Sequence, residues 1–370
     1  MTDQVQTAEG RQDRQEHGHQ ATRTDRECCD GPHDDRDPDE EPEQGDGCRR
    51  HDLSVAALRA GRRAARSRPC IARILQAMIL WPVAMLDARR GDPSLRIVDV
   101  RWTLGQPGAG RAAYDAGHLP GAIHVDMDAD LADPAGLGAP GRHPLPDPRA
   151  FTARLGALGI GTHDTVVAYD DAGGGYASRL WWMLDDLGHP DVHVLDGGIG
   201  AWTAAALPLT TEVPVWPPAE LALADRWSRV IDRPALTERL GSVVLLDARA
   251  PERYRGEVEP IDPVAGHIPT AVNAPTGGNL APDGRFLAPD ALAARFASLG
   301  VGGSEPGGGK PGASDVVTSC GSGITACQNA LAMRVAGFAP PLVYVGSYSD
   351  WSRSGMPIAT GPEPGDPPSR

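Results

Sequence analysis

The chain repeats itself at an offset of about 149 residues, and this repeat restricts its fold more than any other feature. An Asp-x-Arg triplet, a Gly-His-x-Pro segment and a stretch from a Trp to a Pro each occur twice. The paired segments are 99–101 and 247–249, 117–120 and 266–269, and 202–208 and 351–357. Matches at one common offset indicate a duplicated domain.

Each copy alternates short apolar runs with helical patterns. In the first copy, helices are predicted at 150–155 and 176–184. In the second copy, a strand is predicted at 315–318 and a helix at 326–336. Alternating β and α elements predict a parallel sheet flanked by helices. The predicted fold class is therefore α/β, with two tandem domains of this kind.

The Pro-rich stretch that begins at Pro208 predicts a linker between the copies. A Gly-rich insertion at 302–312 predicts a surface loop in the second copy. The predicted divisions are an extension at 1–75, a first domain at 76–208, a linker at 209–228 and a second domain at 229–362.

The N-terminal extension differs in composition from the rest of the chain. Residues 1–50 are rich in charged residues, Gln and Gly with almost no large apolar side chain, which predicts disorder. Residues 51–73 are basic and precede an apolar run at 74–86, as in a secretory signal. That run is too short to span a membrane and leads directly into the first domain, so we prefer a helix packed on the domain. Whether the extension belongs to the native protein or reflects an overextended gene start is left open.

Charge and cysteine content restrict the partners. The formal net charge of −14 argues against a nucleic-acid partner, and no membrane partner is predicted. Four of the six cysteines lie between Cys28 and Cys70, without the spacing of metal ligands, so no metal site is predicted. Their uneven placing argues against a disulfide framework and favours a reducing, cytoplasmic location.

One cysteine lies where the predicted strand at 315–318 gives way to the predicted helix at 326–336. Cys320 follows the apolar run, and Gly321 and Gly323 allow the backbone to turn tightly about its sulfur. Backbone N–H groups of such a turn and the positive end of the helix dipole favour the thiolate, which is the nucleophilic form. The alternative is a packed core thiol, which is our interpretation of Cys327.

The loop Cys-Gly-Ser-Gly-Ile-Thr-Ala-Cys at 320–327 resembles the active-site loop of 3-mercaptopyruvate sulfurtransferases in the two-domain rhodanese family. The resemblance implies that Cys320 carries the transferred sulfur as a persulfide, with no cofactor. It also implies substrate contacts from the loop residues Gly321, Gly323, Ile324 and Thr325. Cysteine phosphatases share a related loop but need an arginine where this chain has Ala326, which argues against phosphoester chemistry.

The segment 247–256 with Glu259-Pro260 resembles the second-domain signature of rhodaneses, in which the arginine before the aromatic residue binds the anionic substrate. That position is Arg253, and a guanidinium suits a carboxylate because it gives two charge-assisted bonds. Mercaptopyruvate enzymes commonly carry a second arginine nine residues later, where this chain has Asp262. If position 262 faces the site, replacement of Asp262 by Arg is expected to lower KM. By contrast, the Asp247–Arg249 and Asp99–Arg101 pairs, and the histidines His118 and His267, recur in both copies and are predicted to be structural.

The resemblance also implies a proton relay. The matching residues are Asp128 and His143 of the first copy and Ser322 of the catalytic loop. A carboxylate would orient the imidazole, which would move a proton through the hydroxyl as the substrate C–S bond breaks. The first copy has Asp170 at the position of Cys320, so it has no nucleophile and is predicted to be catalytically inactive.

The predicted function is transfer of sulfur from 3-mercaptopyruvate through Cys320 to a thiol or cyanide acceptor, with release of pyruvate. Thioredoxin is one thiol acceptor compatible with this reaction. The alternative is a thiosulfate:cyanide sulfurtransferase, although such enzymes usually place Arg-Lys where this chain has Gly321-Ser322. A non-catalytic rhodanese-like binding or sensor module is a further alternative, which an intact Cys320 and Arg253 oppose.

Overall fold

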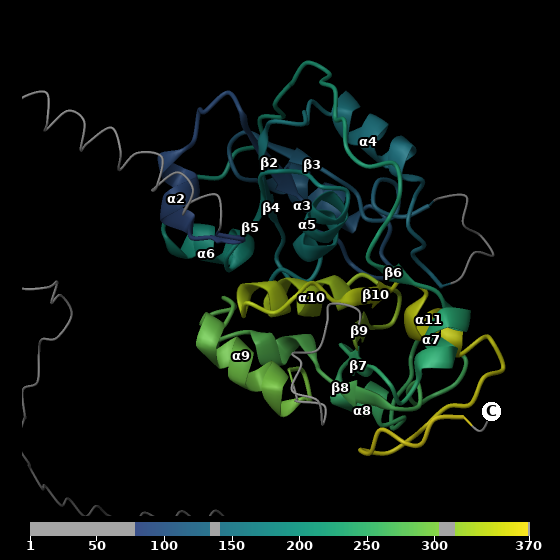
Figure 1. The fold of residues 1–370 in the computed structure, drawn as a ribbon. Helices are drawn as coiled ribbons and strands as arrows, with labels where there is room; N and C mark the ends of the chain where they lie inside the picture. The colour runs from purple at the N-terminus through teal and green to yellow at the C-terminus, as the bar shows by residue number, and fades with distance from the viewer. Residues whose placement is uncertain (1–77, 134–140, 303–314, 369–370) are drawn as a thin grey trace, which may run out of the picture. The chain divides into compact units, whose positions relative to one another are not determined.

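The computed structural model describes residues 78–133, 141–302 and 315–368. Two similar halves follow each other along the chain, the first in purple to teal and the second in green to yellow in Figure 1. The first half contains β1 (Leu80–Trp81), α2 (Val83–Ala88), β2 (Leu95–Asp99), α3 (Ala109–Ala116), β3 (Ala122–His124), α4 (Pro148–Ala157), β4 (Thr165–Tyr169), α5 (Ala177–Asp186), β5 (Val192–Leu195) and α6 (Gly198–Ala204). The second contains β6 (Val230–Ile231), α7 (Arg233–Arg239), β7 (Val244–Asp247), α8 (Pro251–Tyr254), β8 (Ala271–Asn273), the 3-10 helix η1 (Thr276–Asn279), α9 (Pro289–Ser298), β9 (Val316–Ser319), α10 (Ala326–Val335), β10 (Leu342–Tyr344) and α11 (Ser347–Trp351).

Each half is built on a five-stranded sheet. The strand orders are β1-β5-β4-β2-β3 and β6-β10-β9-β7-β8, and every strand pair is parallel. Strands β2 and β4 are buried along their whole length, because helices cover both faces of the sheet. The predicted α/β duplication is confirmed. The predicted disordered extension at 1–75 and most of the predicted loop at 302–312 lie outside the described residues.

The apolar run at 74–86 differs from the single packed helix expected there. Within its described part, Leu80 and Trp81 pair with β5 as an edge strand, and a helix begins only after Pro82. Proline has no N–H and a fixed φ, so it ends the strand and is well suited to precede a helix. None of the helices among the described residues has the length and apolarity needed to cross a membrane.

The inner faces of the two sheets share one apolar core. Helix α5 of the first half packs against α10 of the second, and Leu180, Trp181, Cys327 and Leu331 are all buried in the same cluster. A smaller apolar cluster covers the outer face of each sheet, one in the first half and one in the second. Because α10 follows the catalytic loop directly, this shared core places the loop beside side chains of the first half.

Candidate active site

Cys320 lies between the carboxyl end of β9 and the start of α10, and only 1 % of it is exposed. Its sulfur accepts from the backbone N–H groups of Ser322 at 3.4 Å and Gly323 at 3.0 Å. Gly323 has φ of +80°, and a Cβ there would lie 2.5 Å from the carbonyl oxygen of Val345, so only glycine fits. The turn therefore directs two N–H dipoles at the sulfur and stabilises negative charge on it.

The matching loop of the first half contains a carboxylate in the same place. Asp170 is fully buried and accepts from the backbone N–H groups of Ala172, Gly174, Tyr176 and Ala177, at 2.7 to 2.9 Å. Four donors converging on one carboxylate show that this loop forms an anion-binding turn. The first copy fills its turn with its own side chain, whereas the second places a sulfur there.

Ser347 is a neighbour of Cys320 that the sequence analysis did not identify. Its hydroxyl accepts from the Cys320 N–H at 3.1 Å and lies 4.0 Å from the sulfur. Ser347 has φ of +51°, a conformation that costs a residue other than glycine free energy. The first half has Gly198 in the matching position, with φ of +54°. Comparison of the two copies could have identified Ser347, because the second copy has a serine where the first has a glycine.

The three residues predicted to form a relay lie together. The Nδ1 of His143 is 2.8 Å from the Ser322 hydroxyl, and its Nε2 is 3.2 Å from an Asp128 oxygen. The other Asp128 oxygen accepts from the indole N–H of Trp102 at 2.9 Å, which fixes the carboxylate. Because a carboxylate only accepts, Nε2 carries the imidazole proton and Nδ1 accepts from Ser322. Burial lowers the pKa of His143 to about 4, against the opposing effect of Asp128, so the ring is neutral at pH 7.

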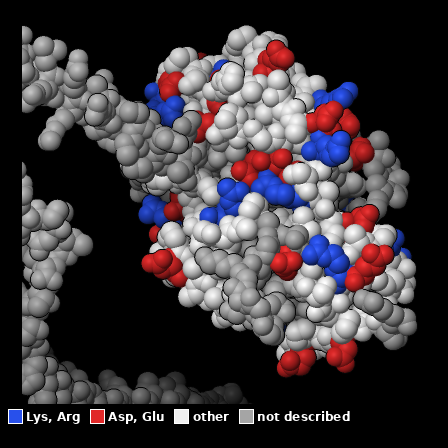
Figure 2. All heavy atoms as spheres, viewed as in Figure 1, with Lys and Arg blue, Asp and Glu red and all other residues white. Residues whose placement is uncertain are grey.

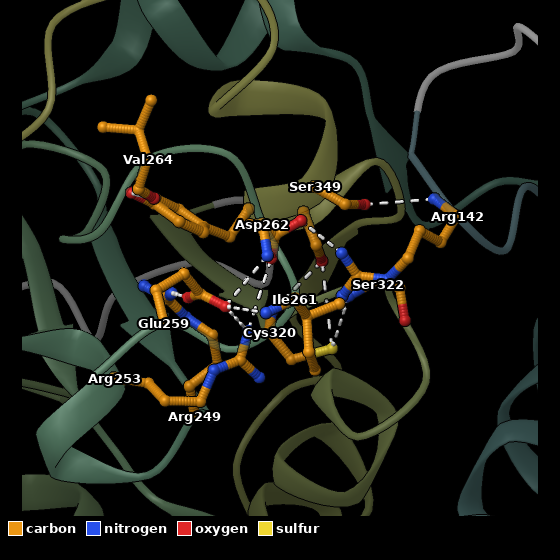
Figure 3. A network of polar contacts seen from close by, with 12 residues as sticks. Arg142, Arg249, Arg253, Glu259, Ile261, Asp262, Val264, Cys320, Ser322 and Ser349 are labelled. Carbon is orange, nitrogen blue, oxygen red and sulfur yellow. Dashed lines mark hydrogen bonds and ion pairs between the residues drawn. The ribbon is translucent and has the colours of Figure 1, made fainter. Parts of the chain in front are cut away.

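Two arginines, one from each half, reach over the catalytic loop (Figure 3). A Cβ built on Gly321 would lie 2.9 Å from Nη2 of Arg142 and 3.6 Å from Nη1 of Arg253. Neither of these nitrogens has an acceptor among the described residues, so both are available to an anionic ligand. Arg142 was not identified from the sequence, which had suggested that a second arginine was missing.

Asp262 holds these two arginines in place (Figure 3). Its buried carboxylate bonds Nη1 of Arg142 and lies 3.3 Å from Nη2 of Arg253 and 3.4 Å from Arg353. Arg253 also donates to Glu259 at 2.7 Å; burial opposes ionisation, yet this bond and backbone donors lower the pKa of Glu259. The Asp262 side chain is buried against these arginines and is not among those that line the cavity at Cys320. An arginine in its place would bring a fourth guanidinium among three, so Asp262→Arg is not expected to lower KM.

A cavity of about 250 Å³ opens above the loop and is lined by both halves. Its lining includes Cys320, Gly321, Ser322, Ile324 and Thr325 of the loop, together with Arg142 and Arg253. Gly323, also predicted to contact substrate, does not line the cavity and instead directs its N–H at the sulfur. Among the described residues, no group of three or more His, Cys, Asp or Glu side chains is arranged to hold a metal ion.

The residues predicted to be structural make buried internal contacts, although Arg249 also lines the cavity. Arg249 pairs with Asp247 and Arg101 with Asp99, each at 2.7 Å and buried. The buried rings of His118 and His267 each lie 2.8 Å from a tyrosine carbonyl and stack on that tyrosine.

On the face in Figure 2, acidic and basic side chains lie interspersed rather than in a patch of one sign.

Comparison with known proteins adds an independent line of evidence. A model of the rhodanese-like domain matches residues 83–205 and 233–354. A Pseudomonas aeruginosa protein named as a 3-mercaptopyruvate sulfurtransferase is 45 % identical over 286 residues, which are 76 % of this chain and 98 % of that protein. A Mycobacterium tuberculosis protein named as a thiosulfate sulfurtransferase is 41 % identical over 265 residues, 71 % of this chain and 89 % of its own. The crystal structure of SseA from Escherichia coli, described as a 3-mercaptopyruvate sulfotransferase, is 30 % identical with a TM-score of 0.63, covering 74 % of this chain and 99 % of its own.

Proposed function

The chain belongs to the rhodanese-like family and is a sulfurtransferase; from this premise, we propose that it takes sulfur from 3-mercaptopyruvate and holds it on Cys320 as a persulfide. The observation that carries the proposal is the pair of free guanidinium nitrogens of Arg142 and Arg253 above a loop that itself has no cation. Carboxylates are bound well by such forks.

The chemical step starts from the Cys320 thiolate. Held by the N–H groups of Ser322 and Gly323, it attacks the sulfur of mercaptopyruvate and forms an S–S bond. The substrate C–S bond breaks, and its electron pair becomes the enolate of pyruvate. A thiol or cyanide then attacks the outer sulfur and releases Cys320 as thiolate.

Protons move through the relay of Asp128, His143 and Ser322. The neutral imidazole accepts the proton of the Ser322 hydroxyl, which accepts the thiol proton of the substrate. The same proton returns to the enolate carbon and completes pyruvate. Asp128 holds the ring in the tautomer this transfer requires.

The charges around the cavity favour a monoanionic donor. Two carboxylates, Glu259 and Asp262, offset Arg142 and Arg253 before any substrate binds. A side chain at Gly321 would have to displace Arg142, because its Cβ would lie 2.9 Å from Nη2 of that arginine. Mercaptopyruvate brings one carboxylate, whereas thiosulfate brings two negative charges.

Thiosulfate is the second candidate donor, since relatives named for each activity match at similar identity. In its favour, Arg353 also contacts Asp262 and shares its negative charge with Arg142 and Arg253. Thiosulfate is the weaker candidate, because Glu259 and Asp262 already offset part of the positive charge of the arginines.

Steady-state kinetics with both donors test the proposal. With cyanide as acceptor, we expect kcat/KM for mercaptopyruvate to exceed that for thiosulfate by at least about tenfold, or roughly 1.4 kcal/mol. Pyruvate and thiocyanate should form in equal amounts. Higher kcat/KM with thiosulfate would contradict the donor assignment but leave the family assignment intact.

The acceptor and the compartment complete the proposal. We expect a small thiol or a thiol protein such as thioredoxin to serve as the acceptor, because the outer sulfur of a persulfide is attacked by thiolates. We also expect a cytoplasmic location, because Cys320 and Cys327 are both free thiols and a reducing compartment keeps thiols in that state.

A further inference from the structure

Arg179, on α5 of the first half, is the most deeply buried charged group near the catalytic loop. It is 0 % exposed and lies against residues of both halves. Its Nη1 donates to the carbonyl of Gly323 at 2.9 Å, and its Nη2 donates to the carbonyls of His143 at 3.1 Å and Leu131 at 3.3 Å. One guanidinium thus joins the catalytic loop to the loop that carries the relay imidazole.

No carboxylate among the described residues forms an ion pair with Arg179. Its hydrogen bonds go to carbonyls, with the Cys327 thiol as a further neighbour, and its Nε has no partner in the part of the chain that the structure describes. Other buried arginines of this chain, such as Arg101 and Arg249, are each paired with an aspartate. A buried cation without a counter-charge is costly, so its retention here calls for an anion nearby.

The catalytic thiol, joined to Arg179 through Gly323, can supply that anion. Gly323, whose carbonyl accepts from Arg179, directs its own N–H at the Cys320 sulfur at 3.0 Å. Burial lowers the pKa of Arg179, while Cys327 and Cys320 act in the opposite direction. The Cys320 sulfur accepts from two backbone N–H groups, which favour an anion there, whereas the Cys327 thiol donates to the Gly323 carbonyl and burial raises its pKa to about 12.

We propose that Arg179 is a positioning residue that provides the buried counter-charge for the Cys320 thiolate and fixes the turn that holds it. The first half then supplies the cation that the catalytic loop lacks. This inference rests on the proposed role of Cys320 as the nucleophile. The other charged or titratable groups around Cys320 are Arg142, His143, Arg249, Arg253, Glu259, Asp262 and Cys327.

The test is the pH dependence of Cys320 alkylation by iodoacetamide, followed on its peptide by mass spectrometry. Only the thiolate reacts, so the midpoint of the profile reports its formation. We expect Arg179→Gln to raise the midpoint by at least about one pH unit. At any pH below the wild-type midpoint, Cys320 should then react about tenfold more slowly. Arg179→Lys, which keeps the charge, should leave the midpoint near that of wild type while kcat falls. Should the Gln variant not fold, Arg179→Met removes the same charge with an apolar chain of similar length.

Arg101→Gln is the matched control, because Arg101 is a buried arginine of the same half that bonds Asp99 and the Gly117 carbonyl. It should lower the melting temperature without moving the alkylation midpoint. Equal midpoints for Arg179→Gln and wild type, or equal shifts for the Gln and Lys variants, would overturn the inference. Sulfur transfer that survives full alkylation of Cys320 would instead overturn the proposed function.

Discussion

Asp262 is expected to set the preference between the two donors, and Asp262→Asn tests this directly. The substitution keeps the shape of the side chain and one oxygen, which can still accept from Arg142, while the amide nitrogen takes the place of the oxygen nearer Arg253. It removes one negative charge from beside the cavity. A dianionic donor gains twice as much from that change as a monoanionic one.

The size of the effect follows from Coulomb's law. At about 8 Å and an effective dielectric constant of about 20, one unit charge contributes roughly 2 kcal/mol. The difference between a dianion and a monoanion is one such contribution, or roughly 30-fold in the ratio of kcat/KM values. Because the cavity is open to water, part of this is screened, and we expect the mercaptopyruvate-to-thiosulfate ratio to fall by at least about tenfold.

The assay is kcat/KM for both donors in wild type, Asp262→Asn and Glu257→Gln. Glu257 pairs with Arg255 on the surface, so its loss changes the net charge equally but away from the cavity, and the ratio should hold. An equal loss for both donors in Asp262→Asn would refute the reasoning. That result would mean that Asp262 only orders the two arginines and does not discriminate between donors by charge.

Three further predictions follow from the site and its surroundings. Cys320→Ser should lower sulfur transfer by more than about a thousandfold, roughly 4 kcal/mol of barrier, while Cys327→Ser keeps most activity in the same assay. Because burial holds the pKa of folded His143 near 4 against about 6.5 when unfolded, wild type should lose up to about 3 kcal/mol of stability as pH falls from 6.5 to 4. Denaturant unfolding of His143→Gln should show a smaller loss over that range; equal losses would place the titration elsewhere. Thr270 has φ of +70° where the first half has Gly121, so Thr270→Gly should raise stability by about 1 kcal/mol, and a lower melting temperature would contradict this.

The fold and the catalytic loop could be predicted because their signals are local. Alternating apolar runs and helical patterns give each βα unit, and a repeat at one offset gives the duplication. The loop from Cys320 to Cys327 is continuous in sequence, so its turn, its glycines and the start of α10 are found together. The helix expected over 74–86 was predicted wrongly, since pairing with β5 decides the state of Leu80 and Trp81.

Two arginines of the site, Arg142 and Arg179, could not be predicted in the same way. Arg142 lies 120 residues from the Asp262 that bonds it, and Arg179 lies 144 residues from Gly323. No periodicity or turn chemistry marks either one. The aspartate at 262 suggested a lost carboxylate clamp, whereas the structure shows a guanidinium supplied at that point by the other half.

The first half has no cysteine in its own turn, but it contributes several side chains to the surroundings of Cys320. Asp128, Arg142, His143 and Arg179 all come from the first half, and the thiol they surround comes from the second. If the first half had kept a cysteine in its own turn, that sulfur would lack these partners, because they face the other loop. Asp170 instead satisfies the four N–H groups of the unused turn internally. Each copy therefore has one such turn, which holds the Asp170 carboxylate in the first copy and the Cys320 sulfur in the second.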